Sequence, residues 1–330
     1  MEIHLTQLKS GIRPTPGFAK KKLAEFAVNV GVRCSHGCTY CSVAASMRMH
    51  HAYKDAGVSP FENMILAIVD PHIDDAVRHD ARTMRKRGMV QLCTIVDAWA
   101  PEGVMYDLGR KCLEAILAEP GWTVRILTKN VAVMKDFDVV QRYRDRVLVG
   151  MSITGTPDKA DVIQAIEPFA SPIPERIASM KEAHRLGLRT YAMFCPLLPG
   201  ISDDPEQIDE LIQTAREFGA EEVFMEGVNA RGKALPNTVT GLEECGYVFE
   251  AEATDDVRTR AVWSDYVRRL VQDSQRSVRK YWDIDKLRFL LYPTGMKPED
   301  VAAIRADDAG VIWLGKEGTK ASKEVSPVLS

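Results

Sequence analysis

The 330-residue sequence has no long apolar segment and little net charge. No window of about 18 consecutive apolar residues is present, so the sequence predicts no membrane-spanning helix. Residues 1–23, MEIHLTQLKSGIRPTPGFAKKKL, lack the basic, apolar and small-residue order of a signal peptide. We therefore expect a cytoplasmic protein with reduced thiols and no membrane partner. The formal net charge of −3 at pH 7 neither favours nor excludes nucleic acid, because binding depends on a local basic patch.

Cysteine is also scarce, and its distribution is uneven. Three of the seven cysteines lie in the segment CSHGCTYC at residues 34–41. The other four are scattered through the chain at Cys93, Cys112, Cys195 and Cys245. An odd number of thiols in a reducing compartment argues against a disulfide framework. The pattern indicates a metal site together with ordinary buried thiols.

From Phe26 onward, short apolar segments alternate with amphipathic helices, which is typical of parallel strands joined by crossover helices. We predict six strands, over residues 26–33, 90–96, 122–128, 146–153, 188–195 and 221–226. Two of the helices between them, within residues 172–187 and 202–219, each end at a glycine. The sequence therefore predicts an α/β fold, a partial (β/α)6 TIM-like barrel with a C-terminal helical extension.

Four regions are expected along the chain. They are an N-terminal extension (1–25), the barrel (26–229), a C-terminal extension that covers the barrel mouth (230–315) and a flexible tail (316–330). Within the C-terminal extension, we expect irregular structure over residues 230–256, because the alternation of strands and helices is lost there. A long helix rich in arginine and aromatic residues follows at 257–283, and KLRFLLYP at 286–293 predicts a further strand.

The three clustered cysteines suit one kind of metal site better than two others. Zinc needs four ligands, and His36 is too close to Gly37 and Cys38 to join all three sulfurs easily. A ferredoxin-type cluster needs four cysteines, and no fourth lies nearby. A [4Fe–4S] cluster held by Cys34, Cys38 and Cys41 leaves one iron open, and that iron can chelate a small molecule. Zinc stays the main alternative.

The spacing Cys34-x3-Cys38-x2-Cys41 after a first strand resembles the signature of the radical S-adenosylmethionine superfamily. Tyr40, just before the third cysteine, resembles the aromatic residue that this superfamily usually places beside the adenine. The resemblance implies a [4Fe–4S] cluster and S-adenosyl-L-methionine as cofactors.

Further segments between about Val30 and Gly200 resemble the spore photoproduct lyase-like branch of that superfamily. They are CSHGCTYC at 34–41, VDAWAPE at 96–102, LTK at 127–129, MSIT at 151–154, IEP at 166–168 and CPLLPG at 195–200. The second of these departs from the branch's pattern at Ala98 and Ala100. The resemblance implies six cofactor-site residues besides Tyr40, namely Asp97, Glu102, Lys129, Ser152, Thr154 and Glu167. Asp97 would take the ammonium group, Lys129 the carboxylate, and the hydroxyls of 152 and 154 the ribose.

By the same resemblance, an electron from a donor such as flavodoxin or ferredoxin cleaves S-adenosylmethionine to a 5′-deoxyadenosyl radical. The radical abstracts hydrogen from a substrate at the barrel mouth. A thiol near the radical can return a hydrogen atom, and Cys93 and Cys195 on the second and fifth strands are the candidates. A buried, inert role is the simpler interpretation for Cys93 and Cys195.

Each single assignment has a structural alternative. Lys129 could be a surface lysine, Ser152 a helix cap and Glu167 a salt-bridge partner. A nucleobase or DNA-lesion substrate is suggested by the resemblance and by the arginine-rich helix at 257–283. Modification of a peptide or small metabolite fits the negative net charge. A non-enzymatic zinc or iron–sulfur scaffold is the alternative from another class, although it needs no row of polar residues at strand ends.

Overall fold

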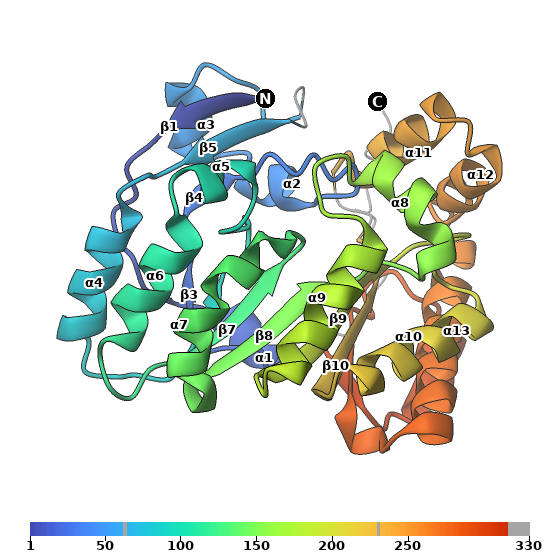
Figure 1. Cartoon of the computed structure of the whole chain (residues 1–330). Helices are drawn as coiled ribbons and strands as arrows, with labels where there is room; N and C mark the ends of the chain where they lie inside the picture. The colour runs from blue at the N-terminus through green and yellow to red at the C-terminus, as the bar shows by residue number, and fades with distance from the viewer. Residues whose placement is uncertain (62–64, 230–231, 316–330) are drawn as a thin grey trace.

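A nine-stranded, largely parallel sheet forms the centre of the computed structural model (Figure 1), which describes residues 1–61, 65–229 and 232–315. Its strands are β2 (Arg13–Pro14), β3 (Phe26–Val28), β6 (Met89–Leu92), β7 (Thr123–Thr128), β8 (Val147–Ser152), β9 (Arg189–Leu197), β10 (Ala220–Gly227), β11 (Leu287–Leu291) and β12 (Val311–Trp313). Their spatial order is β12-β11-β10-β9-β8-β7-β6-β3-β2, and only the β2–β3 pair is antiparallel. The α/β class is confirmed, with β3 and β6 to β10 as the six predicted barrel strands in sequence order.

Helices α4, α6, α7, α9 and α10 lie along one side of this sheet (Figure 1). The helices are α1 (Pro16–Lys20), α2 (Val43–Met47), α3 (His51–Asp55), α4 (Ile73–Thr83), α5 (Pro101–Met105), α6 (Leu108–Leu117), α7 (Phe137–Arg142), α8 (Ala160–Ile166), α9 (Ile173–Arg185), α10 (Pro205–Glu217), α11 (Ala234–Glu244), α12 (Val248–Asp256), α13 (Arg260–Tyr281) and α14 (Pro298–Ala306). Short 3-10 segments are η1 (Val131–Asp136), η2 (Arg144–Arg146), η3 (Pro157–Lys159) and η4 (Ile284–Lys286). None of the described helices has the length and apolar character needed to cross a membrane.

The two faces of the sheet have separate cores, because successive side chains of a strand point to opposite faces. On β9, Ala192 and Phe194 join the large core under the helices. Tyr191 and Met193 join a smaller cluster on the other face, which we call the inner face. Phe18 of α1 packs against this inner cluster. The N-terminal segment therefore covers part of the face that the crossover helices leave open.

The predicted strand at 26–33 is wrong as one strand. It divides into β3 in the main sheet and β4 (Gly31–Arg33), which joins β1 (Glu2–Leu5) and β5 (Leu66–Val69) in a three-stranded sheet. Asn29 lies at the break, where its Oδ1 accepts hydrogen bonds from the backbone N–H groups of Thr94 and Ile95 at 2.8 and 3.0 Å. At Gly31, a Cβ atom would lie 2.2 Å from the Ile68 carbonyl oxygen. The close approach to β5 therefore requires glycine and redirects the chain before the cysteine loop.

The C-terminal extension is more regular than the sequence suggested. The expectation of irregular structure over 230–256 is wrong, since α11 and α12 occupy most of this segment. Both helices are too short to show a clear helical period in the sequence. The long helix is confirmed as α13, and the strand at KLRFLLYP as β11. The predicted tail at 316–330 lies outside the described residues. The division of the chain into four regions stays a prediction.

Candidate cofactor and active site

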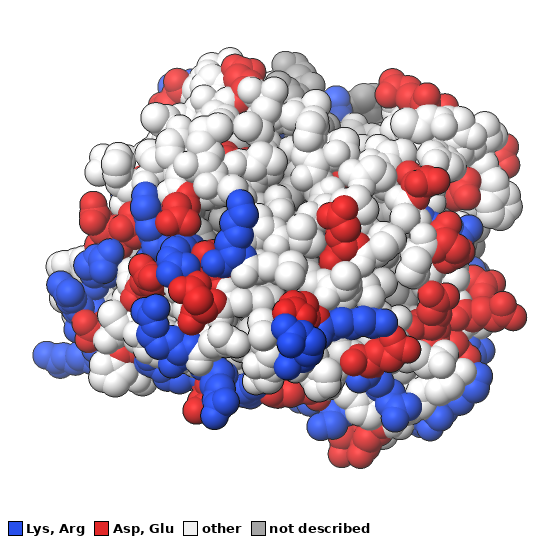
Figure 2. Space-filling view, in the orientation of Figure 1, with Lys and Arg blue, Asp and Glu red and all other residues white. Residues whose placement is uncertain are grey.

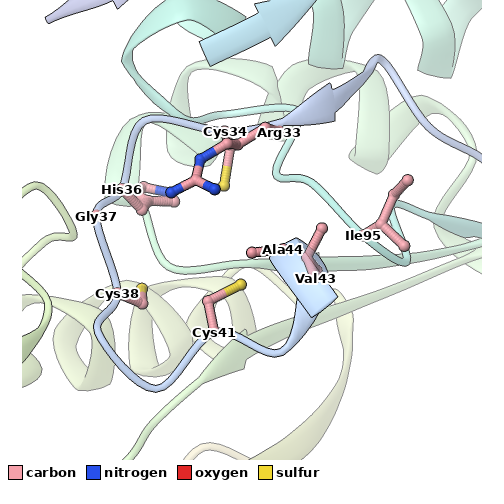
Figure 3. A pocket seen from close by; sticks show the side chains of 9 residues that line it. All are labelled: Arg33, Cys34, His36, Gly37, Cys38, Cys41, Val43, Ala44 and Ile95. Carbon is pink, nitrogen blue, oxygen red and sulfur yellow. The ribbon is translucent and has the colours of Figure 1, made fainter. Parts of the chain in front are cut away.

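The loop between β4 and α2 carries Cys34, Cys38 and Cys41, and their side chains line one hollow (Figure 3). Gly37 turns the loop with a φ of +70°. A Cβ atom there would come within 3.1 Å of Pro168 Cγ, so this position needs glycine for both its backbone and its packing. The local fold thus brings together the three residues predicted to hold a metal.

Burial raises the pKa of all three thiols, and for Cys38 the nearby Glu167 carboxylate adds to the effect and brings the pKa to about 12. Thiolates in such a site require a compensating positive charge, which a metal centre supplies. Among the described residues, no three His, Cys, Asp or Glu side chains converge on one point that a single ion could occupy. Thiols spread around a hollow instead suit a group with several separate points of attachment. The residues present therefore fit an iron–sulfur cluster.

His36 lies inside the same loop but is held away from metal binding. Its Nδ1 atom is 3.0 Å from the Phe169 carbonyl oxygen, and its Nε2 atom is 2.9 Å from Asp97 Oδ2. Both ring nitrogens are thus in contact with oxygen atoms of the protein. His36 is therefore not placed as the fourth ligand that a zinc site in this loop would need.

Asp97, the predicted partner of the cofactor's ammonium group, is buried among protein donors. Its Oδ2 atom accepts hydrogen bonds from His36, Thr128 Oγ1 and the Lys129 backbone N–H, at 2.8 to 2.9 Å. Its Oδ1 atom accepts one from the Trp99 backbone N–H, at 2.9 Å. Burial alone would raise the pKa of Asp97, but these bonds and the His36 charge lower it. The carboxylate thus links the loops that carry His36, Trp99 and Lys129. Of its two oxygens, Oδ1 has the greater remaining capacity to accept hydrogen bonds.

Glu102, in the first turn of α5, supports the cysteine loop from behind. Its carboxylate accepts hydrogen bonds from the backbone N–H and the hydroxyl of Ser35. Burial raises the pKa of Glu102 above its ordinary value, although the bonds from Ser35 oppose this. The side chain thus positions the residue next to Cys34, and its predicted contact with the cofactor stays a prediction.

The other predicted cofactor residues meet around the fully buried Glu167. Its Oε1 atom accepts hydrogen bonds from Tyr40, from Lys129 Nζ at 3.0 Å and from Thr154 Oγ1 at 2.8 Å. Lys129 also donates to Ser152 Oγ at 2.8 Å. We call these five residues and Arg176 the Glu167 network. The structure therefore brings Tyr40, Lys129, Ser152, Thr154 and Glu167 together, and their contact with the cofactor stays a prediction.

Arg176 completes this network and was missed in the sequence. It lies in α9 with 1% of its surface exposed, and its guanidinium donates to the second carboxylate oxygen of Glu167 and to the Ser152 carbonyl oxygen. Burial would raise the pKa of Glu167, but the charges of Arg176 and Lys129 lower it well below its ordinary value. A buried glutamate needs a buried cation, so the sequence could have predicted a cationic partner for Glu167. It could not have shown which arginine fills that role.

The two candidate thiols lie on different faces of the sheet. Cys93 belongs to the large core under the helices, together with Cys112. Cys195 packs against the inner cluster, and its backbone oxygen accepts a hydrogen bond from Ser152 Oγ at 2.9 Å. Burial raises the pKa of both thiols well above the ordinary value. Only Cys195 is thus joined directly to the Glu167 network, and a chemical role for either thiol stays a prediction.

The arginine-rich helix α13 does not present a row of free cations. Each of the cations in the predicted helix at 257–283 contacts a carboxylate or carbonyl group: Arg258, just before α13, with Asp255, Arg260 with Gly295 O, Arg268 with Asp265 and Asp300, Arg269 with Asp265, Arg276 with Asp273, Arg279 with Asp307, and Lys280 with Asp209. Tyr266 is buried and donates to the Leu197 carbonyl oxygen at 2.7 Å. These cations are therefore paired within the protein, and Lys280 links α13 to Asp209 of α10.

Comparison with known proteins places this site in a wider context. The chain is 26% identical over 234 residues to the uncharacterized protein ORF301 of Acidianus two-tailed virus, which covers 69% of this chain and 73% of that protein. It is 26% identical over 232 residues to the uncharacterized protein Rv2578c of Mycobacterium tuberculosis, covering 69% of this chain and 66% of that one. These relatives carry no described activity in their names.

Among solved structures, the fold is similar to that of spore photoproduct lyase complexed with the dinucleoside spore photoproduct. The TM-score is 0.51 at 17% identity, and the match covers 73% of this chain and 66% of the lyase. A variant of the lyase with bound AdoMet and the same dinucleoside gives a TM-score of 0.50 at 16% identity, with the same coverage. At this identity the likeness concerns the fold, and it confirms the partial-barrel architecture that the sequence predicted.

The family model described as the radical SAM superfamily matches residues 28–215. This span is more than half of the chain, and it contains the three loop cysteines and every member of the Glu167 network. The chain therefore belongs to the radical SAM superfamily.

Proposed function

We propose that this protein is an enzyme that cleaves S-adenosylmethionine reductively and abstracts hydrogen from a nucleobase-bearing substrate. The observation that carries the first part is the single hollow lined by Cys34, Cys38 and Cys41 beside the Glu167 network. When bound there, a [4Fe–4S] cluster and S-adenosylmethionine supply an electron and a sulfonium, and hence the 5′-deoxyadenosyl radical. The protein supplies positioning and exclusion of water.

The protein residues have separable tasks in this proposal. The three thiols hold the cluster, and Lys129 is the cation available for the carboxylate of S-adenosylmethionine, since 14% of its side chain is exposed. Asp97 Oδ1 would receive the ammonium group, because among the described residues it accepts one hydrogen bond, from the Trp99 backbone N–H. The hydroxyl hydrogens of Ser152 and Thr154 are donated to the Cys195 carbonyl oxygen and to Glu167, so these side chains would meet the ribose as hydrogen-bond acceptors. Tyr40 stays the proposed neighbour of the adenine.

A nucleobase is proposed as the substrate group because the protein shares its fold with a lyase that holds a dinucleoside photoproduct. The basic helix no longer supports this proposal, since its cations are paired. In the view of Figure 2, Lys and Arg gather over α4, α6 and α7, while the surface above them is largely uncharged. On this face these cations lie among Asp and Glu side chains, so they offer no continuous basic surface to a long polyanion. A nucleoside, or one base of a strand, therefore suits the site better than an extended nucleic-acid footprint.

The electron must come from outside the chain. A small carrier such as flavodoxin or ferredoxin is the proposed donor, because the hollow that receives the cluster is close to the surface at Cys34 and Cys41, which are both half-buried. Titration of the reconstituted protein with reduced flavodoxin tests this partner by bleaching of the cluster absorbance.

Anaerobic reconstitution tests the metal centre. Incubation with iron and sulfide should give a brown, oxygen-sensitive protein with about four irons per chain. Zinc added alone should give no visible absorbance, so the two metals are separated by one spectrum and one metal analysis. A protein that takes up one zinc ion and no iron under these conditions would support the scaffold alternative and contradict the proposed enzyme.

A further inference from the structure

The carboxyl ends of five neighbouring strands place one polar or aromatic side chain each along the inner edge of the sheet. In the order β7 to β11, they are Lys129, Ser152, Cys195, Glu226 and Tyr292. The first two belong to the Glu167 network. Glu226 lies next to Cys195 across the β9–β10 pair, where Met225 pairs with Phe194 and Gly227 with Leu197. The edge thus continues from the cofactor residues to a second group.

The N-terminal segment supplies the remaining side chains of this second group. Lys21 follows α1 directly, and its Nζ atom is 3.3 Å from Glu226 Oε2. The same ammonium lies 5.5 Å from the ring centroid of Phe18 and 5.4 Å from that of Tyr292. A cation, a carboxylate and two aromatic rings therefore meet on the inner face, beside the strand that carries Cys195.

The group has unused hydrogen-bonding capacity and is accessible. The side chains of Lys21 and Glu226 are 17% and 18% exposed, whereas Glu167 is fully buried. An ammonium has three donor hydrogens and a carboxylate about four acceptor sites, so the contacts of Lys21 with Glu226 and Tyr292 leave one donor hydrogen and several acceptor sites for a ligand. Lys21, Glu226 and Tyr292 also lie outside residues 28–215, the part shared with the superfamily. This placement suits residues that select a substrate more than residues that bind the common cofactor.

A nucleobase matches this set of groups. Its edge carries carbonyl acceptors and amino or imino donors side by side, and its flat faces stack on aromatic rings. We propose that Lys21 and Glu226 bind the edge of the substrate's nucleobase between Phe18 and Tyr292, and so determine which base is accepted. This inference rests on the proposed function, and it assigns the N-terminal segment a part in the substrate site.

The charges around Cys195 agree with this arrangement. Burial raises the pKa of the Cys195 thiol, Glu226 raises it further, and Lys21 and Lys129 lower it. Both charged groups of the proposed base site and the lysine of the Glu167 network therefore act on one side chain. A base held by Lys21 and Glu226 would lie next to the cofactor residues and not at a remote surface.

The test exchanges the two charges. The double variant Lys21→Glu/Glu226→Lys keeps an ion pair but reverses the positions of donor and acceptor. Binding of thymidine, deoxycytidine and deoxyadenosine is measured with reconstituted protein and S-adenosylmethionine, both as free nucleosides and as single-stranded homopolymers. The matched control is Lys181→Glu/Glu217→Lys, which reverses an exposed ion pair of 2.7 Å between α9 and α10.

We expect the wild type and the control to prefer one base by about tenfold, and the exchanged variant to lose or reorder that preference. Iron content reports folding, and Glu226→Gln and Lys21→Met give single changes with the same expected loss if the double variant does not fold. Binding of the free nucleosides identifies a small-molecule source, and binding of the homopolymers alone identifies a strand. An unchanged order of preference in variants that retain iron overturns this inference alone. Failure of the wild type to bind any of these probes overturns it together with the nucleobase proposal.

Discussion

The Glu167 network and the Lys21–Glu226 pair are both ionic groups on the carboxyl edge of one sheet, yet they are built differently. Every carboxylate oxygen of Glu167 is bonded to protein donors, and the side chain has no exposed surface. Glu226 has one cationic partner and remains partly exposed. The difference agrees with the proposed roles, a prearranged group for the cofactor and a group with hydrogen-bonding atoms still available for the substrate.

The two groups also differ in where their residues come from. Lys129, Glu167 and Arg176 lie within the segment matched by the superfamily, 28–215, but the Lys21–Glu226 pair joins residues 205 positions apart on either side of it. The proposed cofactor and substrate sites thus lie on one continuous edge. Changes on the two sides should have separable effects.

The largest separation should come from the thiols. Cys34→Ala, Cys38→Ala or Cys41→Ala should abolish cluster assembly, because the proposed cluster uses all three thiols of the loop. Iron content and visible absorbance after anaerobic reconstitution measure this loss. Cys245→Ala, at an exposed cysteine after α11, is the matched control and should retain both signals. Full iron in any of the three loop variants would contradict the ligand assignment.

The next largest difference is expected between Glu167 and Glu226 in their contributions to the free energy of unfolding. Glu167→Gln should lower the free energy of unfolding by roughly 3–5 kcal/mol, because it leaves the buried Arg176 and Lys129 charges without their counterion. The same change at the partly exposed Glu226 should cost about 1 kcal/mol or less. Urea unfolding of both variants and the wild type makes the measurement. Equal losses would remove the proposed distinction between the two groups.

Cofactor affinity should depend on Lys129. Lys129→Met should weaken S-adenosylmethionine binding by about 10- to 100-fold, which corresponds to a lost hydrogen bond to a charged group. Equilibrium dialysis with the iron-loaded protein provides the affinity, and iron content shows whether the cluster persists. Lys135→Met, an exposed lysine in η1, is the matched control. If Lys129→Met binds S-adenosylmethionine with wild-type affinity, the role of Lys129 is purely structural and the proposed cofactor contact is wrong.

The smallest effect should be seen in the pH dependence of stability. The pKa of Glu167 lies below its ordinary value of 4.5, since the two cations outweigh burial, so its contribution is present above pH 4.5 and lost as pH falls. Protonation of Glu167 in the unfolded chain should lower the free energy of unfolding by about 0.8 kcal/mol between pH 7 and about pH 4. The pKa of Lys21 lies above 10.5 despite burial because Glu226 is adjacent, so its contribution fades only in alkali. Glu167→Gln should flatten the acid limb, and an unaltered limb would contradict this assignment.

The proposed cofactor residues could be predicted from the sequence better than the proposed substrate residues. The cysteine spacing and the strand-end residues were visible because each motif is local, and parallel strands bring their carboxyl ends to one edge. Arg176 was not visible, because burial of a helix residue depends on packing. Lys21 was not visible either, since its partner is 205 residues away.

Two further differences have the same origin in long-range contacts. The cations of α13 suggested an exposed basic face, yet Asp209, Asp300 and Asp307 of other elements add to the pairing by Asp265 and Asp273 of the helix itself. The predicted strand at 26–33 is divided because Asn29 and Gly31 meet residues of other segments, near Thr94 and Ile68. Local periodicity reports which residues are apolar, but it does not report which segment they meet.

Product analysis of the reduced, iron-loaded protein tests the central claim most directly. Incubated anaerobically with dithionite and S-adenosylmethionine, the wild type should form 5′-deoxyadenosine and methionine in equal amounts, slowly even without substrate. Cys38→Ala, treated in the same way, should form neither product. An iron-loaded wild type that leaves S-adenosylmethionine intact, or a Cys38→Ala variant that cleaves it as fast as the wild type, would contradict the account.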